Sequence, residues 1–183
     1  MNFQEPIIIS SYSEEWPDLF LTQAKAIREA LGETAIRIDH IGSTAIQGTD
    51  AKPIIDMQIS VASFEPLEAF KAPLEGLGYT FRADNPELTK RYFREKPGER
   101  RTHIHVRQQG SWHEQFALLF RDYLRINASD AQLYAQEKRR LAKLYRNDRE
   151  AYANAKGKII WQIMHRADRW AASTGWAIGE RDM

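Results

Sequence analysis

The hydrophobic pattern of this chain changes its period near residue 111, and this change constrains the fold more than any other feature of the sequence. Before it, short apolar runs stand between turn signals, as expected of strands with a few helices. After it, apolar residues recur every three or four positions, which is the helical period. We therefore expect an α/β (α+β) region over residues 1–110 and a helical region over residues 111–183, packed as one compact unit.

The expected elements follow from local periodicity and from turn residues. Six runs have the pattern of strands: residues 6–10, 35–41, 53–61, 79–83, 90–96 and 102–108. Residues 13–31 and 64–76 have helical spacing, and we expect three more helices after Ser111. Alternation along residues 53–61 places Asp56 and Gln58 on one strand face and the apolar residues on the other.

Composition excludes several classes of protein. The chain has no cysteine, which rules out disulfides, thiolate catalysis and cysteine-ligated zinc. It has no apolar run near the ~20 residues that a membrane span requires, and its first residues lack the pattern of a signal peptide. We therefore expect a cytoplasmic protein with no membrane partner.

Positive charge is concentrated in the helical region. Residues 121–169 hold 12 Lys and Arg against 6 Asp and Glu, whereas residues 1–120 hold 13 against 17. A basic segment of this kind can attract a partner that carries phosphate. Solvated helices rich in Lys and Arg would give the same count.

The stretch HIGSTAIQGTDAKPIID, residues 40–56, combines residues suited to phosphate binding. Gly42 permits a tight turn with a close approach of a ligand to the backbone, and Ser43 and Thr44 offer hydroxyl and amide donors. Lys52 can neutralise a phosphate, and Asp56 can hold a divalent cation that bridges phosphates. Each feature also fits an ordinary turn between two strands, but their order within one strand–loop–strand unit favours a site.

The same stretch resembles the signature of the GrpB family, which has a nucleotidyltransferase-like fold. The resemblance covers roughly residues 6–172 and implies a mixed sheet with helices, followed by three C-terminal helices. Gly42 and Ser43 match the turn of the wider nucleotidyltransferase superfamily, and Asp56 matches its first acidic residue, which implies Mg²⁺ as the cofactor. The matching segments are HIGSTAIQGTDAKPIIDMQISV, THIHV, FRDYLR, Tyr134 with Lys138, and Asp148-Arg149 with Tyr152 and Lys156.

One departure from the superfamily pattern bears on catalysis. The second acidic position is Gln58, whose neutral carbonyl oxygen is a weaker ligand for Mg²⁺ than a carboxylate. On a later strand, His103 and His105 share one face, and His40 stands beside the Gly-Ser turn. Imidazoles there would suit phosphate hydrogen bonding, acid–base catalysis or a transition metal better than Mg²⁺. We therefore take Asp56, His103 and His105 as candidate catalytic residues, and a polar strand face under the helices as the alternative.

In the helical region over residues 111–183, further candidates for ligand binding stand four residues apart. Residues four apart share a helix face, so two guanidiniums could clamp a triphosphate, and a tyrosine with a lysine could contact a base and a phosphate. Together with His40 and the residues of the turn, the candidates for nucleotide or phosphate binding are Arg121, Arg125, Tyr134, Lys138 and Lys156. The same spacing is also common for residues at the edge of a hydrophobic core, which is the alternative interpretation.

Three hypotheses for function follow. The chain could transfer a nucleotidyl or phosphoryl group with the help of a metal ion, with a nucleotide or another phosphorylated small molecule as its partner. It could instead keep the nucleotide pocket without the catalytic metal site, which Gln58 favours. The third is an RNA-binding or helper module that uses the basic helices, and it is weakened by the absence of a stacking motif.

Overall fold

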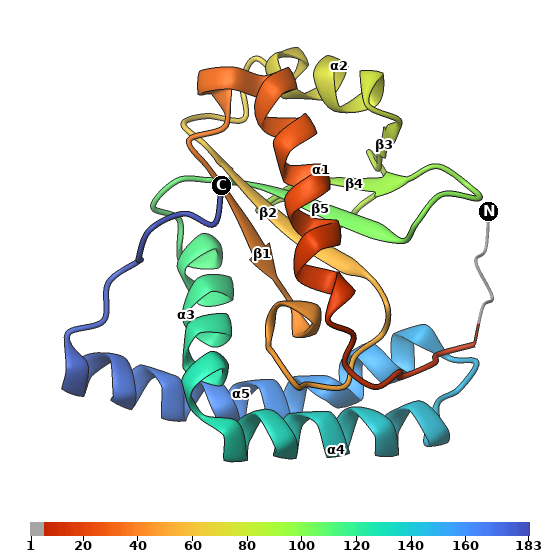
Figure 1. Cartoon of the computed structure of the whole chain (residues 1–183), viewed down its shortest axis with the longest axis vertical. Coiled ribbons are helices and arrows are strands. Elements are labelled where there is room, and N and C mark those ends of the chain that lie inside the picture. The colour runs from red at the N-terminus through yellow and green to blue at the C-terminus, as the bar shows by residue number, and fades with distance from the viewer. Residues whose placement is uncertain (1–5) are drawn as a thin grey trace.

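The computed structural model describes residues 6–183 and contains one mixed sheet covered by helices (Figure 1). The sheet has five strands in the order β1-β2-β5-β4-β3. β2 and β5 pair in parallel, and the other neighbours are antiparallel. The strands are β1 (Arg37–Ile41), β2 (Ile55–Val61), β3 (Tyr79–Phe81), β4 (Arg91–Glu95) and β5 (Thr102–Gln108).

Helices lie on both sides of this sheet. α1 crosses one face, and α4 and α5 lie side by side at one end of the molecule (Figure 1). The α+β class and the C-terminal helices expected from the sequence are confirmed. The helices are α1 (Glu15–Leu31), α2 (Glu68–Gly76), α3 (Trp112–Ile126), α4 (Ala128–Leu144) and α5 (Arg149–Thr174), with a short 3₁₀ turn, η2, at Ser43–Ala45. Within residues 6–183 we find no helix with the length and apolar character needed to cross a membrane.

Strands β2 and β5 form a part of the sheet that is apolar on one face and polar on the other. Met57 on β2 and Ile104 on β5 are fully buried in the core that also includes the apolar stripe of α1. Asp56 and Gln58 alternate with these residues and therefore lie on the opposite face, as predicted. The sheet thus supplies a core on one side and a row of polar groups on the other.

Capping residues fix where several helices begin and end. Ser111 and Asp148 accept hydrogen bonds from the backbone three residues later, at the starts of α3 and α5. Gly32 follows α1 with a φ of 51°. One expectation is wrong: residues 6–10 form no strand, and only Ser10 makes an isolated bridge, with Ala51.

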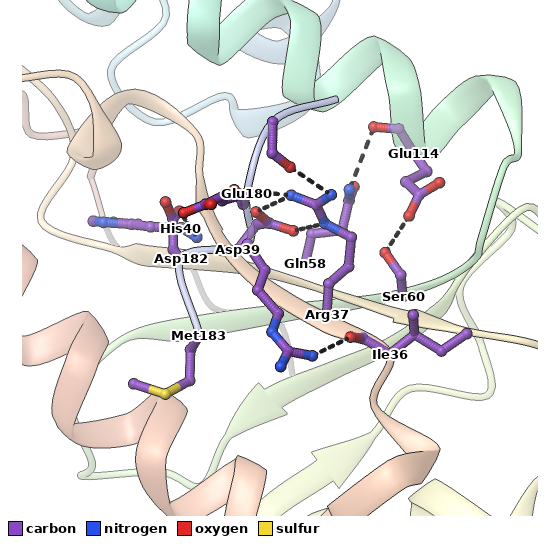
Figure 2. A network of polar contacts seen from close by, with 12 residues as sticks. Ile36, Arg37, Asp39, His40, Gln58, Ser60, Glu114, Glu180, Asp182 and Met183 are labelled. Carbon is purple, nitrogen blue, oxygen red and sulfur yellow. Dashed lines mark hydrogen bonds and ion pairs between the residues drawn. The ribbon is translucent and has the colours of Figure 1, made fainter. Parts of the chain in front are cut away.

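The chain after α5 returns to the outer edge of β1, where it forms a network of polar contacts (Figure 2). Ile38 and Met183 exchange two backbone hydrogen bonds, of 3.2 Å and 3.0 Å. The carboxylate of Asp182 accepts a hydrogen bond of 2.9 Å from the backbone N–H of His40. Residues 176–183, which carried no periodic signal in the sequence, are therefore held against the sheet.

Arg121 on α3 connects this C-terminal segment to the sheet. Its guanidinium lies 2.9 Å from Asp182 and 3.3 Å from Asp39, and it also donates to the backbone carbonyl of His40. The side chain of Arg121 is 3% exposed and that of Asp39 is fully buried. A buried guanidinium between carboxylates holds three separate parts of the chain together.

Replacing Arg121 should destabilise the protein strongly. Arg121→Met removes one of two guanidiniums that pair with the buried Asp39 carboxylate, while Arg37 keeps its contact at 2.6 Å, and we expect the free energy of unfolding to fall by about 1.5–3 kcal/mol. Urea denaturation followed by circular dichroism measures this change. Arg169→Met, an exposed position on α5, is the matched control and should change stability by less than about 0.5 kcal/mol. Equal effects of the two substitutions would contradict the assigned role.

Candidate functional site

A cavity of about 200 Å³ opens where the start of β2 meets the η2 turn and the helices α4 and α5. Its walls combine backbone and hydroxyl groups of the turn, one carboxylate, one imidazole, two tyrosines and three lysines. The lining residues are Gly42, Ser43, Thr44, Ala51, Lys52, Ile54, Asp56, His103, Tyr134, Lys138, Tyr152 and Lys156. The structure thus brings most of the predicted site residues to one pocket.

The turn after β1 lies directly against Asp56. Gly42 has φ 72° and ψ −172°, a conformation that is essentially restricted to glycine. A Cβ atom at this position would lie 2.5 Å from Oδ2 of Asp56, so glycine is required for the contact as well as for the backbone. The Thr44 hydroxyl donates to the carbonyl of Ile54, which ties the turn to the chain entering β2.

Three lysines give the pocket its charge. Lys138 is 2% exposed, and its ammonium donates to the backbone carbonyl of Asp50 at 2.5 Å. Lys52 and Lys156 lie over the ring of Tyr152, at 5.4 Å and 5.3 Å from its centroid. Among residues 6–183, none of these three lysines forms an ion pair with a carboxylate.

Burial and mutual repulsion weaken the charge of two of the lysines. Burial, together with the nearby Lys156, lowers the pKa of Lys138 to about 7. The same two causes, in the same order, lower the pKa of Lys52 to about 8. A negatively charged group placed among them would reverse both shifts, because it would stabilise the ammonium forms.

Asp56 lines the same pocket and has two histidines close to its carboxylate. Its Oδ1 lies 3.1 Å from Nδ1 of His103 and 3.7 Å from Nε2 of His105. Burial raises the pKa of Asp56, but hydrogen bonds from both histidines outweigh burial and hold the pKa below its usual range. Burial lowers the pKa of His105 to about 4, against the hydrogen bond to Asp56, so its imidazole is neutral at pH 7.

Gln58, at the second acidic position of the superfamily, is used in packing. The side chain is fully buried, and its Nε2 donates to the backbone carbonyl of Glu114 on α3 at 3.3 Å (Figure 2). It does not line the pocket that contains Asp56. The site therefore presents one carboxylate rather than two.

Three residues predicted to bind phosphate lie away from the pocket. His40 is on the opposite sheet face from Asp56, because side chains alternate along β1, and its ring stacks on Phe20 of α1 at 4.7 Å. Arg121 is engaged by Asp39 and Asp182, and Arg125 donates to the carbonyl of Ala45. These contacts engage the three side chains outside the pocket around Asp56, and His40 and Arg125 line a separate pocket beside α1. Contact of the three residues with a ligand stays a prediction.

Two further aromatic side chains contribute to the site. Tyr152 lines the pocket beside Lys52 and Lys156, as its spacing of four from Lys156 indicated, whereas Tyr92 had no signal in the sequence. Tyr92 on β4 packs against His103 and His105, at ring distances of 5.6 Å and 5.3 Å. Its contact depends on the pairing of β4 with β5, which local periodicity does not reveal.

Comparison with known proteins defines first the class of fold and then the family. A structure of the Cid1 poly(U) polymerase with MgGTP bound matches with a TM-score of 0.53 at 14% identity, over 74% of this chain and 44% of that one. This likeness shows a nucleotidyltransferase-like fold. The crystal structure of the conserved protein GrpB from Enterococcus faecalis matches with a TM-score of 0.81 at 31% identity, over 89% and 99% of the two chains.

The sequence comparisons agree with the structural ones. The family model described as GrpB protein matches residues 6–166. The UPF0157 protein PA4798 of Pseudomonas aeruginosa is 42% identical over 177 residues, which cover 92% of this chain and 72% of the relative. The chain belongs to the GrpB family.

A methyl group at Gly42 should disturb the site more than one at a comparable glycine. Gly42→Ala forces the turn away from Asp56, and we expect it to lower the free energy of unfolding by about 2–4 kcal/mol, measured by urea denaturation. Gly48→Ala is the control, because Gly48 has φ 71° but nothing within 4 Å of its Cβ position. It should cost only about 1 kcal/mol of backbone strain. Equal costs would show that the close approach to Asp56 has no energetic weight.

Proposed function

We propose that the pocket binds the phosphate groups of a nucleotide or of another phosphorylated small molecule. The observation that carries this proposal is the convergence of Lys52, Lys138 and Lys156 on one small pocket without a carboxylate partner among the described residues. Three ammonium groups held together cost free energy through repulsion and desolvation. A phosphate chain supplies the missing negative charge.

The rest of the lining supports the same ligand. Ser43 stands in the η2 turn and contributes a hydroxyl group, and Tyr134 adds an aromatic wall beside Lys138. The volume of about 200 Å³ is below the ~300 Å³ at which pockets for whole drug-sized ligands begin. The pocket therefore takes the phosphates, while the remainder of the ligand extends through its mouth.

The donor set does not fit the Mg²⁺ chemistry that the fold suggests. Two-metal phosphoryl transfer relies on carboxylates that bridge two hard cations. Here Asp56 is the single carboxylate of the pocket, and Gln58 is turned toward Glu114. Ligand binding is accordingly the primary proposal, and no catalytic step through Mg²⁺ is drawn.

Group transfer is a second candidate, favoured by the pairing of Asp56 with His103 at 3.1 Å inside the same pocket. A carboxylate and an imidazole in contact can accept a proton from an acceptor hydroxyl while the lysines hold the phosphates. His105 lies 3.7 Å from the same carboxylate oxygen and would orient it. The wider similarity to a polymerase structure with MgGTP bound supports a nucleotide as the ligand class.

Neutralising one lysine should weaken nucleotide binding. Lys138→Met keeps the length and the apolar stem but removes the charge, and we expect at least a tenfold loss of affinity, equivalent to about 1.5 kcal/mol. Calorimetric titration with ATP, GTP, CTP and UTP in EDTA measures the effect. Lys143→Met, an exposed lysine on the same helix, should bind like the wild type. Failure of the wild type to bind all four nucleotides and inorganic triphosphate would contradict the proposal.

The pH dependence of nucleotide binding, measured by the same titration, provides a second test. Phosphate binds the ammonium form, and the pKa values of Lys138 and Lys52 lie at about 7 and about 8 in the free protein. Binding at pH 8 must therefore take up protons, and affinity should fall as the pH rises from 7 to 9. Proton uptake appears as a dependence of the measured enthalpy on the ionisation enthalpy of the buffer.

Transfer is tested by incubating the protein with nucleoside triphosphates labelled at the α- or γ-phosphate. If transfer occurs, Asp56→Asn should lower its rate by at least about 100-fold while nucleotide binding persists, because the carboxylate acts as the base. His103→Gln should reduce the rate without abolishing it. Label transfer that is unchanged in Asp56→Asn would exclude Asp56 as the base.

A further inference from the structure

We propose that Asp56, His103 and His105 form a binding site for one transition-metal ion, of the kind preferred by imidazole ligands, rather than for Mg²⁺. Asp56 and His103 line the pocket, and His105 lies 3.7 Å from the Asp56 carboxylate. The inference concerns the same site as the proposed function, but it does not require that a nucleotide binds there.

Strand register brings the three donors together. β2 and β5 run in parallel, with Asp56 opposite His103 and Gln58 opposite His105. Because alternate residues share a face, both imidazoles stand on the same side of the sheet as the carboxylate. One atom from each of the three residues can be chosen so that all three lie within 4.8 Å of one another. The backbone of two neighbouring central strands thus holds the donors in place.

The separations suit a shared ion. Oδ1 of Asp56 lies 3.1 Å from Nδ1 of His103 and 3.7 Å from Nε2 of His105. Ligands at about 2.1 Å from a metal are separated by about 3.0 Å in octahedral and about 3.4 Å in tetrahedral geometry. The separation of 3.1 Å at His103 lies between these two values, whereas the separation of 3.7 Å at His105 exceeds both, so a small movement of His105 toward the ion would complete the coordination.

The chemistry of the donors decides which ion fits. Two imidazoles with one carboxylate suit Zn²⁺, Fe²⁺, Co²⁺ or Mn²⁺, whereas Mg²⁺ requires oxygen ligands in nearly ideal octahedral geometry. Asp56 is the one carboxylate in the lining, and the amide of Gln58 is directed to Glu114. The change from acid to amide removes a Mg²⁺ ligand, and the histidines on β5 supply nitrogen instead.

The sharing of one carboxylate oxygen by the two histidines also indicates a missing ligand. Both imidazoles are directed at the same oxygen of Asp56, His103 through Nδ1 and His105 through Nε2. Two imidazoles sharing one oxygen make poor use of buried polar groups. An ion between the three side chains would bond to both rings at once.

The site is accessible from the pocket, since Asp56 and His103 both line it. An ion bound there would share a cavity of about 200 Å³ with the three lysines. Phosphate oxygens could then contact the metal on one side and ammonium groups on the other. This arrangement differs from a pair of Mg²⁺ ions held between two carboxylates.

The test uses the full chain without a histidine tag, treated with EDTA and then dialysed. Calorimetric titration with Zn²⁺, Mn²⁺ and Mg²⁺ should show one equivalent of Zn²⁺ bound at least 100-fold more tightly than Mg²⁺. Co²⁺ should give a visible absorption band that reports the coordination geometry. His103→Gln and His105→Gln should each weaken Zn²⁺ binding by at least about tenfold, since even the loss of an outer-shell partner has such an effect.

Controls make each outcome decisive. His165→Gln removes an exposed histidine on α5 and should bind Zn²⁺ like the wild type. Mg²⁺ binding as tight as that of Zn²⁺, or Zn²⁺ affinity unchanged in both site variants, would overturn the inference. The comparison of metals uses the wild type, so it remains decisive even if a variant fails to fold. Nucleotide binding in EDTA is measured separately, so failure of the proposed function and failure of the metal site are distinguishable.

Discussion

The parallel pairing of β2 with β5 is the constraint on which the rest of the structure depends. It places an apolar row, including Met57 and Ile104, on one face and a polar row, including Asp56 and His103, on the other. The apolar row forms the core with α1, and the polar row faces the C-terminal helices. A shift of one residue in this register would exchange the two faces, so the core and the site are specified by the same hydrogen bonds.

Much of this arrangement was predictable, because it depends on local patterns. Alternation placed Asp56 and Gln58 on one face, and the Gly42 turn was expected beside Asp56 because both belong to one strand–loop–strand unit. Spacing of four along a helix correctly brought Tyr134 and Lys138 to the pocket. The same spacing does not bring Arg121 and Arg125 to that pocket, because periodicity shows which residues share a helix face but not which part of the protein that face meets. The partner of Arg121, Asp182, lies in a segment without any periodic signal.

The pocket holds more positive than negative side chains. One carboxylate faces three lysines, and the acidic position that could have offset them is a buried glutamine. The pocket thus combines the Gly-Ser turn and one carboxylate with nitrogen donors from β5. Bound phosphate would offset the lysines, and a transition-metal ion would bind the carboxylate and the two imidazoles.

The C-terminal segment has a consequence for how the molecule meets other copies of itself. β1 is an edge strand, and exposed edges are templates for pairing with strands from other chains. Backbone bonds between Ile38 and Met183 occupy part of that edge, while Asp182 from the same segment neutralises Arg121. Detachment of this segment would expose a sheet edge and, in the same event, remove one of the carboxylates that pair with a buried guanidinium. Resistance to aggregation and the stability of the fold are therefore coupled through a few residues at the end of the described chain.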